Sequence, residues 1–204
     1  GRWVVDEALH QASQWPEHIL VALNASARQL MDVGFPDHVN DCLRRYGVEA
    51  SRLEIEITET TLIENDETAL SVLHRLRAMG CRISLDDFGT GYASLSYLRR
   101  FPIDKVKIDQ SFLRGSSTDD VAIIQGICDL AARLSLDIVA EGIETDAHCR
   151  MVREAGCGFG QGYLFDRPLM PDAVSKRLFD EEVILPVLRA PSLVMPSAEP
   201  AVPA

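Results

Sequence analysis

The sequence contains no Cys-x-x-Cys pair, and its five cysteines are scattered along the chain. Structural zinc sites and dithiol redox motifs use closely spaced cysteines, so neither is indicated. The odd number of isolated thiols also argues against a disulfide framework. The five histidines fall on expected helices or loops, away from strand ends, and suggest no zinc site. We therefore expect a cytoplasmic protein whose thiols serve mostly as small core residues.

Long apolar runs and an excess of basic residues are also missing. No signal peptide is recognisable, and no apolar stretch is long enough to cross a bilayer. The chain has 20 Lys and Arg against 31 Asp and Glu, a net charge of −11. Binding a nucleic-acid backbone needs clustered Lys and Arg, so no nucleic-acid polymer is expected as a partner. The acidity fits a metal site, although acidity alone usually indicates only solubility.

What the sequence does contain is a regular alternation of short apolar segments and amphipathic helices. After one leading helix at 3–15, strands are expected at 19–23, 53–59, 83–87, 105–109, 136–140 and 160–165. Such alternation predicts a parallel sheet, either a (β/α) barrel or a doubly wound sheet. Gly-x-Gly-x-x-Gly is absent, which weakens the dinucleotide-binding version. We expect one α/β domain over 1–188 and a disordered Pro/Ala-rich tail over 189–204.

Polar side chains occur at or just beyond the end of each expected strand. Asp86 and Asp87 are adjacent, and two ionised carboxylates so close repel each other unless a cation or proton lies between them. Their hard oxygen atoms suit Mg²⁺, Mn²⁺ or Ca²⁺, although a solvated turn is the simpler reading of the pair alone. The carboxyl ends of parallel strands meet at one edge, so these residues are candidates for a common site. The candidates are Asn24, Glu56, Asp86, Lys107, Glu141 and Gln161.

Several of these residues have a structural alternative. Asn24 is well placed to be a helix N-cap after its strand. Glu141 and Glu144 can cap the following helix, and Gln161, between two glycines, can be structural. For each residue taken alone, these alternatives stay open.

The second and fourth strands offer similar alternatives. Glu56 can be an exposed strand residue, as we expect for Glu54 two positions earlier. Glu59 can begin a helix and interact with its dipole. Lys107 can be a salt-bridge partner of the acids, and Lys105, expected in solvent, serves as its comparison.

Taken in order, the motifs resemble those of the EAL family of cyclic-di-GMP phosphodiesterases over residues 1 to about 180. One such motif is weak, but the ordered set is specific. The motifs are Leu23-Asn24-Ala25-Ser26, Glu56-Ile57-Thr58-Glu59, Asp86-Asp87-Phe88-Gly89-Thr90-Gly91-Tyr92, Lys107-Ile108-Asp109, Ala140-Glu141-Gly142-Ile143-Glu144-Thr145 and Gln161-Gly162-Tyr163-Leu164-Phe165.

The Glu-Ala-Leu motif that gives the family its name is not found at a strand. Glu7-Ala8-Leu9 lies in the leading helix, and we interpret it as a coincidence. The resemblance implies a TIM-like barrel of eight strands, of which about six are present here. We therefore expect an incomplete barrel that lacks two N-terminal strands.

The resemblance implies hydrolysis of cyclic-di-GMP to linear pGpG with two ions, Mg²⁺ or Mn²⁺. Asn24, Glu56 and Asp86 would ligate the first ion. Asp86 would also bridge to the second ion, beside Asp87. Lys107 would steady the attacking water and the phosphate as a point charge.

Further roles follow from the same resemblance. Glu141 would act as the base or as an outer ligand for the attacking water, and Glu144 would support that region. Gln161 would contact the substrate or order water. Glu59 would anchor the loop at 87–95, through which the family also forms homodimers.

Three functions remain in competition. The first is a cyclic-di-GMP phosphodiesterase, with negligible turnover expected from these residues alone. The second is a degenerate EAL module that binds cyclic-di-GMP or a protein partner without turnover. The third and weakest is another divalent-metal barrel enzyme with an enolate or phosphate substrate. An upstream GGDEF or sensory domain is expected in the full-length protein, which upstream segments can anchor to a membrane.

Overall fold

The computed structural model describes residues 1–204 except 60, 62–65, 90–94, 115–117 and 180–204. The expected tail at 189–204 and the domain boundary at 188 lie outside the described residues. The described helices are α1 (Arg2–Ala12), α2 (Ala27–Leu30), α3 (Phe35–Tyr46), the 3-10 helix η1 (Ala50–Arg52), α5 (Asp66–Ala78), α6 (Leu95–Arg100), α7 (Ser111–Arg114), α8 (Thr118–Arg133), α9 (Asp146–Glu154) and α10 (Pro171–Phe179).

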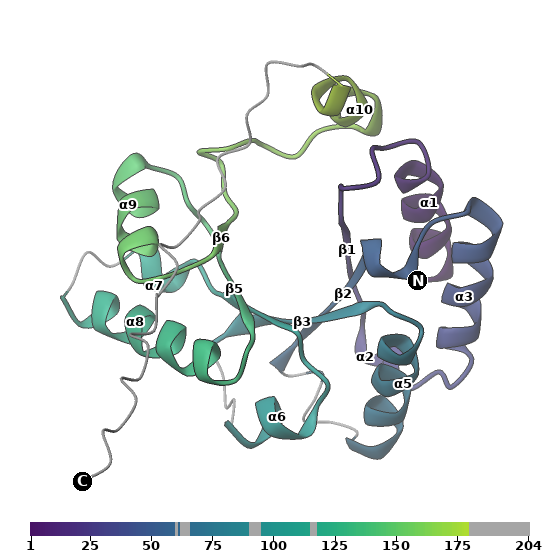
Figure 1. The fold of residues 1–204 in the computed structure, drawn as a ribbon, viewed down its shortest axis with the longest axis horizontal. Helices are drawn as coiled ribbons and strands as arrows, with labels where there is room; N and C mark the ends of the chain where they lie inside the picture. Colours follow the sequence, from purple (N-terminus) through teal and green to yellow (C-terminus); the bar gives the residue numbers. More distant parts are fainter. Residues whose placement is uncertain (60, 62–65, 90–94, 115–117, 180–204) are drawn as a thin grey trace, which may run out of the picture.

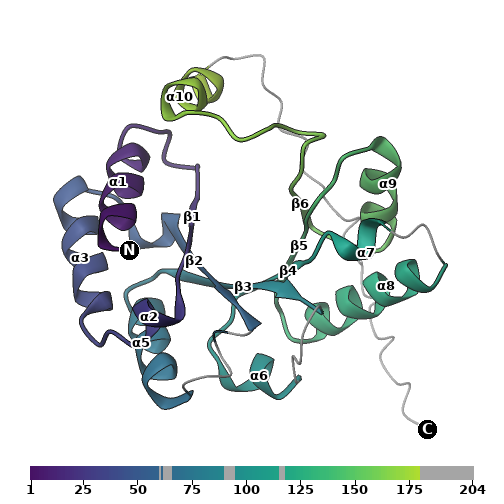
Figure 2. The same ribbon diagram turned by 180° about the vertical axis from the view of Figure 1, so that it is seen from behind.

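Six parallel strands form one sheet, in which the order in space follows the order in the chain. The strands are β1 (Val21–Asn24), β2 (Leu53–Thr58), β3 (Arg82–Phe88), β4 (Lys105–Ile108), β5 (Asp137–Ala140) and β6 (Phe159–Gly160). A doubly wound sheet reverses its order at a switch point, and this sheet has no reversal. Figures 1 and 2 show the sheet curling into part of a ring, with most helices on its outer side. The prediction of an incomplete TIM-like barrel is confirmed.

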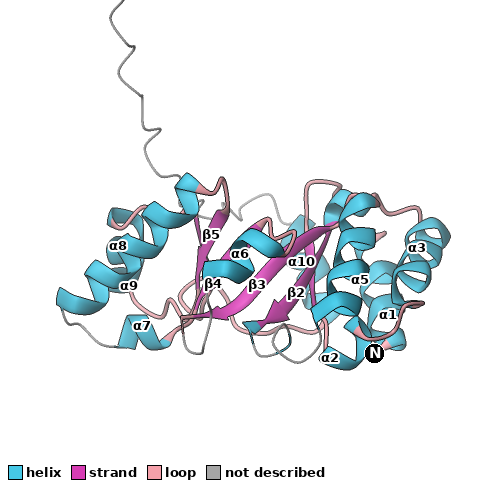
Figure 3. Cartoon of the chain, turned by 90° about the horizontal axis from the view of Figure 1, so that it is seen from below, coloured by secondary structure: helices cyan, strands magenta, loops and turns pink. Residues whose placement is uncertain are grey.

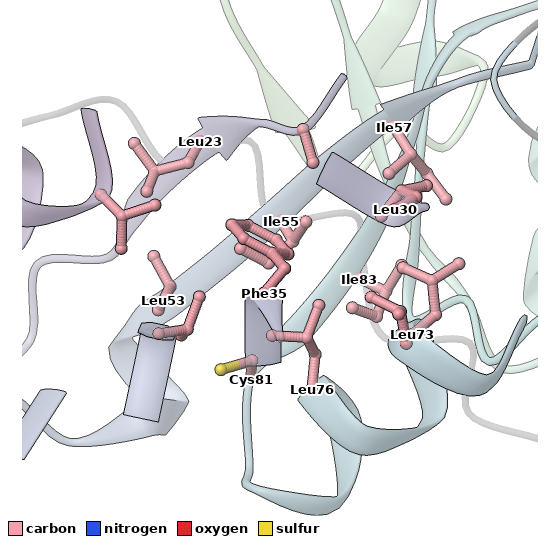
Figure 4. Packing of buried hydrophobic residues seen from close by; sticks show 14 of the residues in the cluster. Leu23, Leu30, Phe35, Leu53, Ile55, Ile57, Leu73, Leu76, Cys81 and Ile83 are labelled. Carbon is pink, nitrogen blue, oxygen red and sulfur yellow. The ribbon is translucent and has the colours of Figure 1, made fainter. Parts of the chain in front are cut away.

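The apolar core lies between the outer face of the sheet and the helices around it (Figure 3). Ile55 of β2 and Ile83 of β3 are fully buried in one cluster with Phe35 of α3 and with Leu73 and Leu76 of α5 (Figure 4). Fully burying a large apolar side chain contributes about 1.5–3 kcal/mol. This packing holds the strands in register and so determines where their carboxyl ends lie.

The first strand differs from its prediction. We expected 19–23 to be buried on both faces, but β1 runs over Val21–Asn24, and Leu20 before it is 47% exposed. Within the strand, Leu23 is buried whereas Ala22 and Asn24 are exposed. The reason is position: among the described residues β1 is an edge strand, and only β2 pairs with it.

The last strand is also shorter than predicted. We expected a strand over 160–165, but β6 covers only Phe159–Gly160, and a turn follows it. In that turn the Leu164 amide donates to the Ile143 carbonyl at 2.9 Å, which ties the turn to the segment after β5. The short helices α2 and α7 were not predicted, because four residues are too few to show a helical periodicity.

Two helix ends have a clear local cause. The Thr145 hydroxyl accepts from the His148 amide at 3.1 Å and so caps α9. Gly47 ends α3 in the left-handed conformation, with φ 65°. These local signals place the helices that follow β1 and β5.

The final helix, α10, lies across the opening of the curled sheet (Figure 1). The Trp15 indole Nε1 donates to Ser175 Oγ at 2.9 Å, which joins α10 to the segment after α1. Among the helices that the structure describes, none combines the length and apolarity needed to cross a membrane.

Candidate metal and active site

The candidate site lies at the carboxyl ends of β2 to β5, on the inner face of the curled sheet. Side chains alternate along a strand, so Leu53, Ile55 and Ile57 of β2 face the helices while Glu56 faces inward. In the same way Asp86 on β3 and Lys107 on β4 point to the inner face. The sheet therefore brings charged groups from separate βα units to one place.

Lys107 is the centre of this group. Its Nζ lies 3.0 Å from Glu56 Oε1, 3.1 Å from Asp86 Oδ1 and 2.7 Å from Glu141 Oε1. The Lys107 side chain is only 5% exposed, so these contacts are largely shielded from water. One ammonium thus binds three carboxylates supplied by β2, by β3 and by the residue just after β5.

Burial governs the protonation of these groups. It raises the pKa of Glu56 and of Glu141 above the usual carboxyl value, and the charge of Lys107 offsets this only in part. Burial alone would lower the pKa of Lys107, but the hydrogen bond to Glu141 and the charges of Glu56, Glu141 and Asp86 raise it well above its usual value. Lys107 is therefore a permanent cation at neutral pH.

A second feature is a set of carboxylates that suits a divalent cation. One oxygen from each of Asp86, Asp87 and Glu141 lies within 4.8 Å of the other two. Burial raises the pKa of Asp87, and the neighbouring charges of Asp86 and Asp109 raise it further. Among the residues that the structure describes, this is the group whose Asp, Glu, His or Cys ligands are close enough to hold an ion. Three carboxylate oxygens at the rim suit a hard divalent cation.

The backbone around Asp87 is unusual. Asp87 has φ 56°, a left-handed conformation that costs about 1–2 kcal/mol for a residue with a Cβ. Next to it, the Gly89 amide donates to Glu59 Oε1 at 2.8 Å, and Glu59 is buried at the end of β2. This hydrogen bond ties the turn after β3 to β2. Residues 90–94 of the expected loop lie outside the described residues.

Three further predicted site residues, Asn24, Glu144 and Gln161, are exposed. Asn24 pairs in register with Glu56 across β1 and β2, and its side chain is exposed. Glu144 and Gln161 are both exposed and line a recess of about 210 Å³ together with Glu141. The recess therefore opens beside the carboxylate group rather than within it.

Two residues of this recess were missed by the sequence analysis: Gln110 and Tyr163. Both lie inside or next to motifs that the sequence does show, Gln110 directly after Lys107-Ile108-Asp109. Gly162 is required here, because a Cβ at this position would lie 2.2 Å from the Ile143 carbonyl oxygen. The close approach of these two turns forms one wall of the recess.

The structure overturns the expectations for Glu54 and Lys105. We expected both in solvent, but Glu54 is 3% exposed and its Oε2 lies 2.6 Å from Lys105 Nζ. Both residues are two positions before Glu56 and Lys107, so they face the same inner side of the sheet. Lys105 is therefore no solvated reference for Lys107 but the cation of a second buried pair.

Comparison with known proteins agrees with this geometry. A family model described as EAL domain matches residues 1–168. The bifunctional diguanylate cyclase/cyclic di-GMP phosphodiesterase MucR of Pseudomonas aeruginosa is 42% identical over 175 residues, which cover 83% of this chain and 26% of that protein. The chain covers no more than 32% of the length of the first curated relatives that it matches.

Solved structures give the same result. The PaMucR phosphodiesterase in its c-di-GMP complex has a TM-score of 0.80 and 40% identity, covering 85% of this chain and 73% of that one. A manganese and cyclic-di-GMP complex of Klebsiella pneumoniae BlrP1 has a TM-score of 0.77 and 32% identity, covering 83% of this chain and 44% of that one.

Proposed function

Because the chain belongs to the EAL domain family, we propose that it hydrolyses one phosphodiester bond of cyclic-di-GMP and releases linear pGpG. The observation that carries the proposal is the position of Lys107 among Glu56, Asp86 and Glu141, next to the Asp86–Asp87 carboxylates. An ammonium and several carboxylates at one rim are the groups that phosphodiester hydrolysis requires.

We assign two divalent ions, Mg²⁺ or Mn²⁺, to this rim. Asn24, Glu56 and Asp86 would hold the first ion, and Asp86 and Asp87 the second. When bound, such ions lower the pKa of water and offset the negative charge of the phosphate. The ligand set supports this assignment because carboxylate and amide oxygens suit hard cations.

The chain's own residues would move the proton, orient the water and position the turn that carries Asp87. Burial raises the pKa of Glu141, and this residue would accept a proton from the attacking water. Lys107 keeps its charge and would orient that water and one phosphate oxygen. Glu59 would hold the turn after β3 through Gly89, and so fix the backbone that carries Asp87.

The recess beside Glu141 would receive part of the dinucleotide. Gln161 would contact the substrate or order water there, and Glu144 would support the wall. The remaining partners are also proposals: a homodimer through 87–95, an upstream GGDEF or sensory domain in the full-length protein, and a cytoplasmic location for this domain.

Binding without turnover is the second candidate. It is favoured by the position of Glu7-Ala8-Leu9, which lies in α1 with Leu9 buried in the core rather than at the rim. A binding module would offer Lys107 and the recess to an anionic dinucleotide.

The test is incubation of cyclic-di-GMP with Mn²⁺ or Mg²⁺ and chromatography for pGpG. We expect metal-dependent pGpG formation by the full-length protein and negligible turnover by residues 1–204 alone. Calorimetric binding of cyclic-di-GMP without any pGpG in either protein would support the binding module instead. Absence of both binding and hydrolysis would overturn both proposals.

A further inference from the structure

Two buried ion pairs lie one above the other on the inner face of the sheet. We call Glu56–Lys107 the upper pair and Glu54–Lys105 the lower pair. In each, a glutamate of β2 reaches a lysine of β4 across β3, at 3.0 Å and 2.6 Å respectively. Successive inward residues are ~7 Å apart along a strand, so the pairs form two adjacent layers.

Ser84 is a residue of β3, the strand that both ion pairs cross. It is in register with Glu56 on one side and with Lys105 on the other, and it is 0% exposed. Its hydroxyl has no hydrogen-bond partner. A small residue at this position leaves room for the glutamate and lysine side chains to meet over β3.

The positive and negative charges cancel in the lower pair. They do not cancel in the upper group, by which we mean Lys107 with Glu56, Asp86, Asp87 and Glu141. Lys105 Nζ has Glu54 as its carboxylate and lies 5.7 Å from the Phe159 ring centroid. Lys107 is shared among three carboxylates, with Asp87 beside them. The excess of negative charge in the upper group is what attracts a divalent cation.

We propose that Glu54 is a positioning residue for the metal site: it holds Lys105 in the lower layer and so keeps a second ammonium, besides that of Lys107, away from Glu56. This inference rests on the proposed function. An ammonium left unpaired inside the sheet is costly. Asp137 of β5 is in register with Lys105 but is already paired with Arg82. Without Glu54, the flexible Lys105 side chain would therefore turn to Glu56, which lies in the same row across Ser84. Glu56 would then face two ammonium groups and become a weaker ligand.

The experiment measures Mn²⁺ affinity by the electron paramagnetic resonance of free Mn²⁺, in the full chain of residues 1–204. We expect E54Q to bind Mn²⁺ about 10-fold more weakly than the wild type, in the range of other changes that act through a ligand. The double variant E54Q/K105M removes the competing ammonium, so its affinity should return to the wild-type value.

A matched control tests whether any lost carboxylate has this effect. Asp37 of α3 pairs with Arg75 of α5 at 2.5 Å, among the helices around the sheet, and both side chains are exposed. D37N should bind Mn²⁺ like the wild type. Circular dichroism on each variant would show that it is folded under the conditions of the titration.

Each outcome decides one question. If the wild type binds no Mn²⁺, the proposed metal site is wrong whatever E54Q does. If the wild type binds Mn²⁺ and E54Q binds it equally well, or if E54Q/K105M stays as weak as E54Q, the role of Glu54 is refuted. Should E54Q not fold, E54D tests the same point: a shorter carboxylate holds Lys105 less well, so native affinity in E54D would refute the role.

Discussion

The upper and lower pairs use the same residue types, the same two strands and nearly the same contact distance, yet only one of them belongs to a candidate active site. The lower pair consists of one carboxylate and one ammonium. Around the upper lysine the sheet adds Asp86 from β3 and Glu141 from the end of β5. We therefore place the proposed cation site at the upper pair, where three carboxylates share one ammonium.

The largest effect is expected from removing the upper ammonium. K107M should lower cyclic-di-GMP hydrolysis by the full-length protein about 1,000-fold, the loss typical of a preorganised charge at a reacting group. Mn²⁺ affinity should be kept or increased, because Lys107 no longer competes for Glu56, Asp86 and Glu141. Turnover assays and Mn²⁺ titrations on one preparation would separate the two effects.

The control for K107M is the double variant E54Q/K105M, which removes both charges of the lower pair. Hydrolysis by this variant should remain within a few-fold of the wild type. An equal loss of turnover in both variants would mean that the two pairs do not differ in function.

The second largest effect concerns the carboxylate that the upper group gains from β3. D86N removes a charge from the set Asp86, Asp87 and Glu141, whose oxygens lie within 4.8 Å of one another. We expect Mn²⁺ binding to weaken about 100-fold or more, since the residue is proposed to contact both ions. D37N, a change to an exposed carboxylate of α3 that pairs with Arg75, should bind Mn²⁺ nearly normally in the same titration.

Neutralising either pair is expected to have a smaller effect, which is on the unfolding free energy of the metal-free protein. Replacing a balanced buried pair by neutral residues of similar size is often neutral or stabilising by about 1–4 kcal/mol. E54Q/K105M should therefore unfold in urea at the same or a higher concentration than the wild type. E56Q/K107M should unfold at a lower concentration, because Asp86 and Glu141 lose their counter-ion. The reverse order of midpoints would contradict the charge comparison.

The smallest effect is a pH dependence of the metal-free protein. Burial raises the pKa of Glu56 and Glu141, so between pH 7 and about 5 the folded state binds more protons than the unfolded state. Their contribution to stability is therefore present at low pH and is lost as the pH rises through the folded-state pKa. Asp6 and Asp32 have a lowered pKa and act only at more acidic pH.

Thermal melting in buffers from pH 5 to 7 would measure this slope. The double variant E56Q/E141Q should have a flatter profile than the wild type, because its two amides do not titrate. Added Mn²⁺ should stabilise most at pH 7, where the carboxylates are ionised. A wild-type slope unchanged by the two substitutions would show that these glutamates do not control it.

Much of the fold was predictable because its signals are local. Apolar segments alternating with amphipathic helices predicted the parallel sheet, and Thr145 and Gly47 are residue types that favour the helix ends at which the structure has them. Glu56, Asp86, Lys107 and Glu141 were recognised because each lies at or near the end of an expected strand. These features depend on a few neighbouring residues and on the period of a strand or helix.

The sequence by itself therefore determined the succession of strands along the chain and the residues at their carboxyl ends. Only the tertiary structure decided the order of the strands in the sheet, the burial of Glu54 against the half-buried Lys105, and the sharing of Lys107 by three carboxylates. The physical reason is that an alternating strand has one face toward the helices, while burial of its other face depends on how the whole sheet curls. That curvature comes from packing between residues far apart in the chain, which no local pattern records.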